Sequence, residues 1–104
     1  MALAITNENY ESLMASGKPV VIDFWATYCG PCKVVGQFIS QLAAEYEGKV
    51  KIAKCDVEEC EDIAIDLGIR SVPTIIFFKE GKVVDKIVGA ANKAKIQEKI
   101  ESLL

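Results

Sequence analysis

The chain has 104 residues, about the size of one domain, so we expect a single domain that spans residues 1–104. Hydrophobic residues make up 51% of it and charged residues 26%, a balance that supports a packed core and excludes intrinsic disorder. The 12 Lys and Arg are outnumbered by 15 Asp and Glu, and the basic residues are scattered singly, so nucleic acid is not an expected partner.

The first part of the chain predicts a short helix followed by a buried strand. Thr6, or the residue after it, can cap a helix that ends near Gly17, and residues 3–5 can form a short strand before it. Residues 20–26 are β-branched and aromatic without alternation, which is typical of a central strand buried on both faces. Asp23 is the one charged residue in this run.

The middle of the chain predicts a helix, a strand and a second helix. After residues 29–32, C-G-P-C, apolar residues at three- and four-residue steps predict an amphipathic helix that runs to about Gly48. Residues 49–57 are expected to form a second strand. Residues 60–67 are expected to form a short helix that ends at Gly68.

The last part predicts a hairpin and a closing helix. Strands at residues 74–79 and 82–88 are separated by Glu80-Gly81, a tight turn, and Asn92 can cap a final amphipathic helix. Strands that are joined through helices run parallel, whereas the two strands of a hairpin run antiparallel. The sequence therefore predicts an α/β fold with a central mixed β-sheet of four to five strands, flanked by four helices.

The amino-terminal residues carry no secretory pattern. Residues 1–6 contain no Lys or Arg, and their apolar stretch stops at Asn7, which is too short for a signal sequence. No apolar run reaches the roughly 18 residues that a transmembrane helix needs. We therefore expect a cytoplasmic protein with no membrane partner, whose four cysteines serve redox catalysis or metal binding rather than a disulfide framework.

Cys29 and Cys32 form the pair with the clearest chemistry. Two thiols separated by two residues, where a strand turns into a helix, can close on each other. The amino end of the helix favours the thiolate over the thiol. Cys29 precedes the helix and can point outward, whereas Cys32 lies inside its first turn. We therefore expect Cys29 to attack and Cys32 to resolve.

The other two cysteines allow an alternative in which all four hold a structural zinc ion. Four residues separate Cys55 from Cys60 and the chain has no His, which weighs against a zinc site. We expect Cys55 in the apolar layer and Cys60 at a helix start, apart from each other and not disulfide-bonded. Regulatory oxidation at Cys60 is the functional alternative.

Residues 24–33, F-W-A-T-Y-C-G-P-C-K, resemble the active-site segment of the thioredoxin family. Residues 68–74, G-I-R-S-V-P-T, resemble the loop that ends in the cis-proline of this family, and residues 78–81 and 88–90 are similar to its hairpin and its last glycine. The resemblance covers nearly the whole chain, so it implies the thioredoxin fold. No metal is implied.

The resemblance also implies roles for a buried carboxylate and a lysine. Asp23 is similar to a buried aspartate of the family, and a desolvated Asp has a raised pKa that suits it to accept the thiol proton of Cys32. Lys54 is similar to a lysine near that aspartate and would moderate its charge. The alternatives are a carboxylate at a strand edge or a capping role for Asp23, and a solvated strand residue for Lys54.

A third group of residues is expected to contact the substrate. Aromatic side chains beside the cysteines offer an apolar surface, although Trp25 can also simply pack in the core. A cis bond before the proline would leave the backbone of Val72 free to pair with an extended substrate strand. The predicted substrate-binding residues are Trp25, Tyr28, Gly30, Pro31, Val72, Pro73 and Gly89.

The resemblance implies a general protein-disulfide reductase, a thiol-disulfide oxidoreductase that donates electrons to target proteins. Gly30-Pro31 between the cysteines marks a reductant, whereas isomerases and oxidases of the family typically carry a His there. No cofactor is expected on the chain beyond a redox-active Cys29–Cys32 disulfide. The implied partners are target proteins with exposed disulfides and a thioredoxin reductase that uses NADPH, and the protein is expected to be a monomer. A disulfide isomerase and a non-catalytic binding module are the alternatives.

Overall fold

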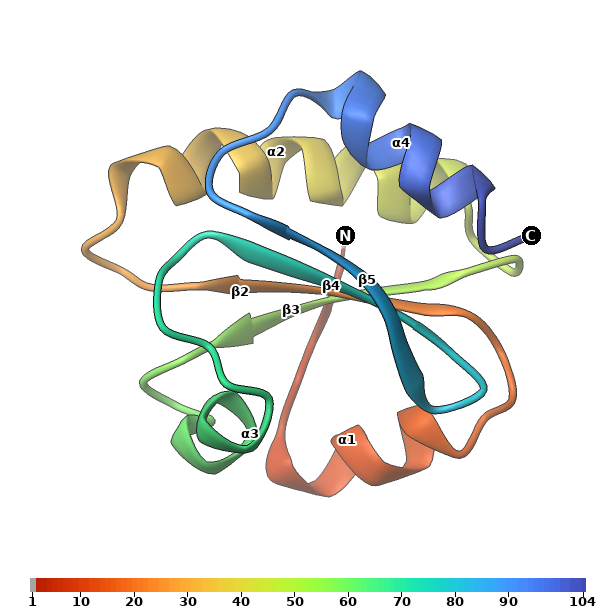
Figure 1. Ribbon diagram of the computed structural model, residues 1–104, viewed down its shortest axis with the longest axis horizontal. Coiled ribbons are helices and arrows are strands. Elements are labelled where there is room, and N and C mark those ends of the chain that lie inside the picture. Colours follow the sequence, from red (N-terminus) through yellow and green to blue (C-terminus); the bar gives the residue numbers. More distant parts are fainter. Residues whose placement is uncertain (1) are drawn as a thin grey trace.

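The sheet is built around one strand that is buried on both faces, as the apolar run predicted. The computed structural model describes residues 2–104. Its elements in chain order are β1 (Leu3–Ala4), α1 (Asn7–Met14), β2 (Val20–Trp25), α2 (Gly30–Glu45), β3 (Lys51–Asp56), α3 (Glu61–Asp66), β4 (Thr74–Lys79), β5 (Lys82–Val88) and α4 (Lys93–Glu101). Figure 1 shows α2 and α4 on one face of the sheet and α1 and α3 on the other.

The five strands are ordered β1-β3-β2-β4-β5. β1 and β2 pair with β3 in parallel, whereas β2 pairs with β4, and β4 with β5, in antiparallel fashion. The predicted α/β fold with a mixed sheet and four helices is therefore confirmed. The elements begin and end within a few residues of their predicted bounds, and the largest differences are at the ends of α1 and α2, which stop at Met14 and Glu45.

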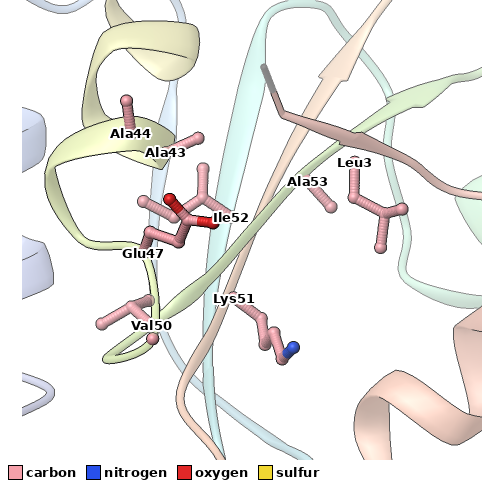
Figure 2. Close-up of a pocket in the computed structure, with 9 residues that line it drawn as sticks. Leu3, Ala43, Ala44, Glu47, Val50, Lys51, Ile52 and Ala53 are labelled. Carbon is pink, nitrogen blue, oxygen red and sulfur yellow. The ribbon is translucent and has the colours of Figure 1, made fainter.

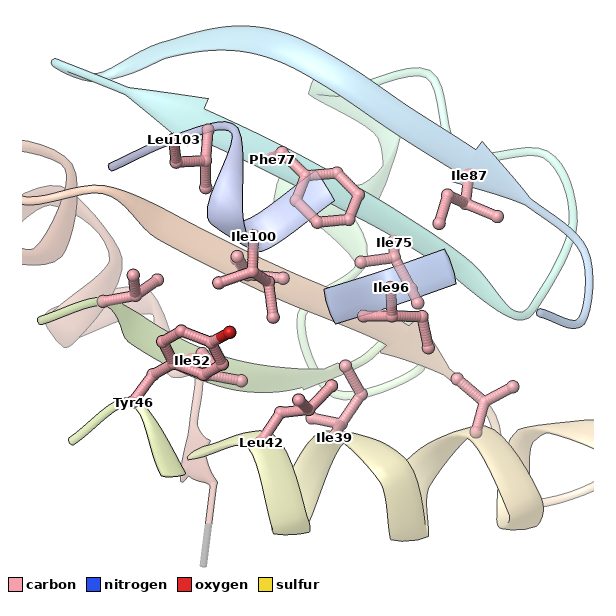
Figure 3. Close-up of a cluster of buried hydrophobic side chains, with 13 residues drawn as sticks. Ile39, Leu42, Tyr46, Ile52, Ile75, Phe77, Ile87, Ile96, Ile100 and Leu103 are labelled. Atoms are coloured by element: carbon pink, nitrogen blue, oxygen red, sulfur yellow. The ribbon is translucent and has the colours of Figure 1, made fainter. Parts of the chain in front are cut away.

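Two apolar layers cover the two faces of the sheet, because neighbouring residues of a strand point to opposite sides. Figure 3 shows the layer between the sheet and helices α2 and α4, in which Ile39 and Leu42 meet Ile96 and Ile100. The layer on the α1 and α3 side holds Ile5, Leu13, Val20, Ile22, Phe24, Ala53, Cys55, Cys60, Ile63, Ile76 and Phe78. Asp23 is buried on the same sheet face as Val21, toward α2.

Turn chemistry closes the hairpin where the sequence predicted it. Glu80 and Gly81 both have positive φ, 53° and 77°, which is the backbone of a tight two-residue turn between antiparallel strands. A Cβ on Gly81 would also meet the carbonyl oxygen of Met14 at 3.3 Å. Glycine at position 81 therefore satisfies both the turn and the close approach of α1.

Candidate active site

A disulfide joins Cys29 and Cys32 where β2 gives way to α2. The Cα atoms of the two cysteines are 5.3 Å apart. Cys29 is the amino-terminal cap of α2, and its Sγ accepts a hydrogen bond from the backbone N–H of Cys32 at 3.2 Å. Pro31 lies in the first turn of α2, where backbone N–H groups have no partner within the helix, so a proline costs no helical hydrogen bond there. The predicted redox-active disulfide is therefore present, and unpaired N–H groups of the helix face its sulfur atoms.

Both sulfur atoms are more covered than the sequence suggested. The prediction that Cys29 points outward is wrong, because Cys29 is only 7% exposed and Cys32 is 4% exposed. The capping position turns the sulfur of Cys29 back over the end of the helix. The side chains of Trp25, Val57 and Val72 then pack around the disulfide. Exposure thus distinguishes the two cysteines only slightly, and Cys29 is the more open one.

Asp23 is fully buried in β2, and neither of its carboxylate oxygens has a hydrogen-bond partner within the described residues. Burial disfavours its charged form and raises the pKa of Asp23 to about 7, while the charge of Lys54 acts in the opposite direction. The alternative of a carboxylate at an open strand edge is thereby excluded. Asp23 is a group that exchanges a proton near neutral pH.

Lys54 lies opposite Asp23 in the register of β2 and β3. Its ammonium nitrogen is 5.1 Å from the centre of the Trp25 ring, an arrangement in which the ring face attracts a cation. The side chain is half-buried and reaches α2, so it is not simply a solvated strand residue. The structure therefore brings Asp23, Lys54 and Trp25 together beneath the amino-terminal part of α2.

The loop before β4 packs Val72 against the cluster of Ala26, Cys29 and Cys32, and it also holds Pro73, which is buried. The Val72–Pro73 peptide bond is cis, as the resemblance implied. Gly89, with φ of 93°, donates its backbone N–H to the carbonyl oxygen of Pro73 at 2.9 Å. Within residues 2–104, the backbone of Val72 makes no hydrogen bond, so its polar groups are free for another chain.

The aromatic residues near the disulfide differ in exposure. Tyr28 is 75% exposed, whereas Trp25 is half-buried and its indole nitrogen is covered without a partner in the described part of the chain. Gly30 and Pro31 are exposed beside Tyr28. An exposed surface of modest size therefore surrounds the sulfur atoms.

Cys55 and Cys60 lie on the far side of the sheet from Lys54. Both are free thiols that are not bonded to each other, and Cys55 is buried, as predicted, whereas Cys60, which was expected only at a helix start, is buried as well. The two thiols nevertheless influence each other, because burial, together with Cys60, raises the pKa of Cys55 to about 12. The Cys60 thiol donates to the carbonyl oxygen of Ile5 at 3.3 Å. The turn after β3 folds the Cys60 backbone onto Asp56, which returns its side chain to the strand.

Sequence reasoning missed two residues that contact the site. Val57 packs on the disulfide because its N–H donates to the carbonyl oxygen of Trp25 at 3.0 Å, which extends the pairing of β2 and β3. Gly36 lies against the Lys54 side chain. A glycine at a buried helical position was the available signal for Gly36.

A pocket of about 320 Å³ lies at the other end of α2. Figure 2 shows Leu3, Glu47 and Lys51 among the residues that line it. None of its lining residues belongs to the disulfide or the proline loop.

Among the described residues, no cluster of His, Cys, Asp and Glu side chains could hold a metal ion, so the structure does not support the zinc alternative. No helix in residues 2–104 is both long and apolar enough to cross a membrane.

Comparisons with known proteins agree with this geometry. The family model for thioredoxin matches residues 1–102. A thioredoxin of Chlorobaculum thiosulfatiphilum is 50% identical over 97 residues, which cover 92% of this chain and 90% of that protein. Thioredoxin C-2 of Corynebacterium nephridii is 45% identical over 92 residues, 88% of this chain and 85% of that protein. The chloroplastic M-type thioredoxin of Pisum sativum is 44% identical over 94 residues, 90% of this chain and 55% of that protein. The chain has the thioredoxin fold and belongs to the thioredoxin family of thiol-disulfide oxidoreductases.

Proposed function

We propose that residues 1–104 act as a single thioredoxin domain that reduces exposed disulfides in other proteins, with Cys29 and Cys32 as the redox pair. The observation that carries this proposal is the disulfide at the amino end of α2, on a sheet that holds a buried carboxyl with a pKa of about 7. The redox pair and the buried acid supply a nucleophile, a resolving thiol and a proton acceptor.

The first step is attack by the Cys29 thiolate on one sulfur of the target disulfide. A bond forms between Cys29 and that sulfur, the target S–S bond breaks, and the second target sulfur leaves as a thiolate that takes up a proton. The helix end supports the attacking charge, because the Cys29 sulfur accepts the Cys32 N–H.

The second step is resolution by Cys32. Its thiol gives its proton to the carboxylate of Asp23, and the resulting thiolate attacks the Cys29 sulfur of the mixed disulfide. The Cys29–Cys32 bond forms, the target leaves as its second thiolate, and two electrons have passed to the target. A pKa of Asp23 near 7 suits this exchange, and Lys54 keeps that pKa lower than burial alone would make it.

The surface around the disulfide is proposed to bind the target segment. Tyr28 offers an exposed aromatic face, and the free backbone groups of Val72 can pair with an extended strand. Main-chain pairing gives affinity without demanding a particular side-chain sequence, which suits a general reductase. Gly30, Pro31, Gly89 and Trp25 complete the proposed contact surface, whereas Pro73, which was also expected there, is buried.

After each turnover the Cys29–Cys32 disulfide has to be reduced again. We assign this to a thioredoxin reductase that takes electrons from NADPH, so that the chain carries electrons without binding a cofactor of its own. We place this cycle in the cytoplasm, where a pool of reductant is available, and expect the protein to act as a monomer. The two free thiols Cys55 and Cys60 agree with a reducing compartment.

A redox titration against glutathione tests the proposal. A reductant of this family is expected near about −270 mV, and an isomerase near about −180 mV. A potential in the second range would favour the isomerase. Failure of Cys29 and Cys32 to exchange with glutathione would favour a binding module without turnover.

A further inference from the structure

Gly36 lies in the interior of α2 and is buried. Glycine in a helix interior is destabilising relative to alanine, so its presence calls for a local reason. A Cβ built at position 36 would stand 3.0 Å from the ammonium nitrogen of Lys54 and 3.7 Å from its Cε. The side chain that position 36 lacks would therefore crowd the end of Lys54, which would have to move by a few tenths of an ångström.

The ammonium group of Lys54 lies between α2 and the ring of Trp25. The backbone of α2 at Gly36 is on one side, and the Trp25 ring, with its centre 5.1 Å from the nitrogen, is on another. Asp23 is opposite Lys54 in the strand register and accepts no hydrogen bond from any described residue. The ammonium therefore acts on the buried carboxylate through its charge alone, and the strength of this effect depends on where the ammonium rests.

We propose that Gly36 is a positioning residue that leaves room for the Lys54 ammonium between α2 and the Trp25 ring, from where it acts on Asp23. This inference rests on the proposed function in so far as Asp23 serves as the proton acceptor. It concerns a residue that touches neither the sulfur atoms nor the target.

A methyl group at position 36 would push the ammonium toward solvent. An open hollow of about 620 Å³, lined by Gly36, Lys54, Lys33, Gln37, Ser40 and Gln41, lies on that side. Movement in the other direction, toward the buried carboxyl, would cost the ammonium its hydration. The outward shift lengthens the distance to Asp23 and weakens its attraction for the ammonium, so Asp23 should hold its proton to higher pH.

The other groups around Asp23 stay the same in such a variant. From β3, the Cys55 thiol is near enough to feel the charge of Asp23. From β4, the residue opposite is the uncharged Ile75. From α2, Cys32 is held in the disulfide in the oxidised protein and does not titrate. A change in the titration of Asp23 therefore reports on Lys54.

The test is the pH titration of the Asp23 carboxyl carbon by NMR in the oxidised protein. Gly36→Ala is expected to raise the midpoint by a few tenths of a pH unit. The fold is expected to persist, because alanine favours a helix. An unchanged or lowered midpoint would overturn the inference.

Two matched variants separate positioning from helix stability. Ala44→Gly changes the helix propensity of α2 at an exposed residue and is expected to leave the midpoint unchanged. Lys54→Met is expected to raise the midpoint by itself, and adding Gly36→Ala to it should cause no further shift. A shift in Ala44→Gly, or a full extra shift in the double variant, would contradict the inference.

Reduction of a target disulfide over the same pH range tests the proposed function separately. If the pH profile of the reduction rate shifts in Gly36→Ala together with the titration midpoint of Asp23, then Gly36 positions Lys54 and Asp23 is the proton acceptor. If the midpoint rises while the rate profile stays, Gly36 positions Lys54 but Asp23 is not the proton acceptor.

Discussion

Asp23 and Lys54 lie opposite each other on neighbouring parallel strands, yet neither carboxylate oxygen of Asp23 has a hydrogen-bond partner among the described residues. The Lys54 ammonium lies over the Trp25 ring instead. Burial therefore outweighs the nearby positive charge, and the pKa of Asp23 rises to about 7.

Replacing Asp23 by Asn is expected to stabilise the folded protein at pH 8. Because the folded-state pKa of Asp23 is raised, the folded protein binds its proton more tightly than the unfolded chain, and stability is lost as pH rises from about 4 to about 7. The gain at pH 8 is at most about 4 kcal/mol, since a unit of pKa is worth about 1.4 kcal/mol, and the unpartnered amide reduces it. Urea unfolding at pH 8 and pH 4 measures it.

The gain should fall to less than about 1 kcal/mol at pH 4, because folded Asp23 is protonated there and the unfolded carboxyl is only partly ionised. Asp85→Asn is the matched control, because a hydrogen bond from Lys99 lowers the pKa of Asp85 and this variant should lose stability at pH 8. If Asp23→Asn were less stable than the original protein at pH 8, burial of the ionised Asp23 carboxylate would not be destabilising the fold.

Replacing Cys32 by Ser is expected to leave attack intact and to remove resolution. Target proteins should then accumulate as covalent adducts on Cys29, while turnover is abolished, because no second thiol can release them. Cys29→Ser should give neither adducts nor turnover. Mass spectrometry of the adducts identifies the bonded cysteine, and adducts formed through Cys32 in Cys29→Ser would reverse the assignment of the two roles.

Cys55 and Cys60 are expected to be dispensable for reduction and to remain free thiols, although their side chains interact. Burial and the raised pKa of Cys55 keep it protonated and unreactive. A thiol count after gentle oxidation and denaturation should give two free thiols per chain. The double variant Cys55→Ala, Cys60→Ser should keep full activity and lose about 1 kcal/mol of stability at each buried position.

Because the two thiols influence each other, the thiol count has to distinguish free thiols from a second disulfide. No free thiol in a monomeric oxidised protein would reveal a second internal disulfide between Cys55 and Cys60. Adducts between two chains through Cys60 would instead support regulatory oxidation at that residue.

Replacing Tyr28 by Ala is expected to weaken target binding with little effect on stability. The side chain is 75% exposed, so its removal should change the free energy of unfolding by less than about 0.5 kcal/mol. Loss of its apolar contact should raise the KM for a protein disulfide by about three- to tenfold, or about 1 kcal/mol. Val84→Ala, an exposed change on β5 away from the disulfide, should leave KM unchanged.

The redox pair and the order of the elements could be predicted from the sequence because both depend on local spacing. The unalternating apolar run of residues 20–26 predicts a central strand, and two intervening residues between Cys29 and Cys32 allow a disulfide. The prediction of a cis bond before Pro73 rested on the resemblance to the thioredoxin family, because local spacing carries no signal for a cis bond. The burial of Asp23 follows from its neighbours in the same run.

Only the tertiary structure decided how side chains from different elements meet. The approach of Lys54 to Gly36 depends on the packing distance between β3 and α2, and the contact of Cys55 with Cys60 depends on how the turn after β3 folds back. The low exposure of Cys29 depends on three side chains from separate segments. Periodicity assigns a residue to a face of its own element, but the atoms it touches are set by the positions of the other layers.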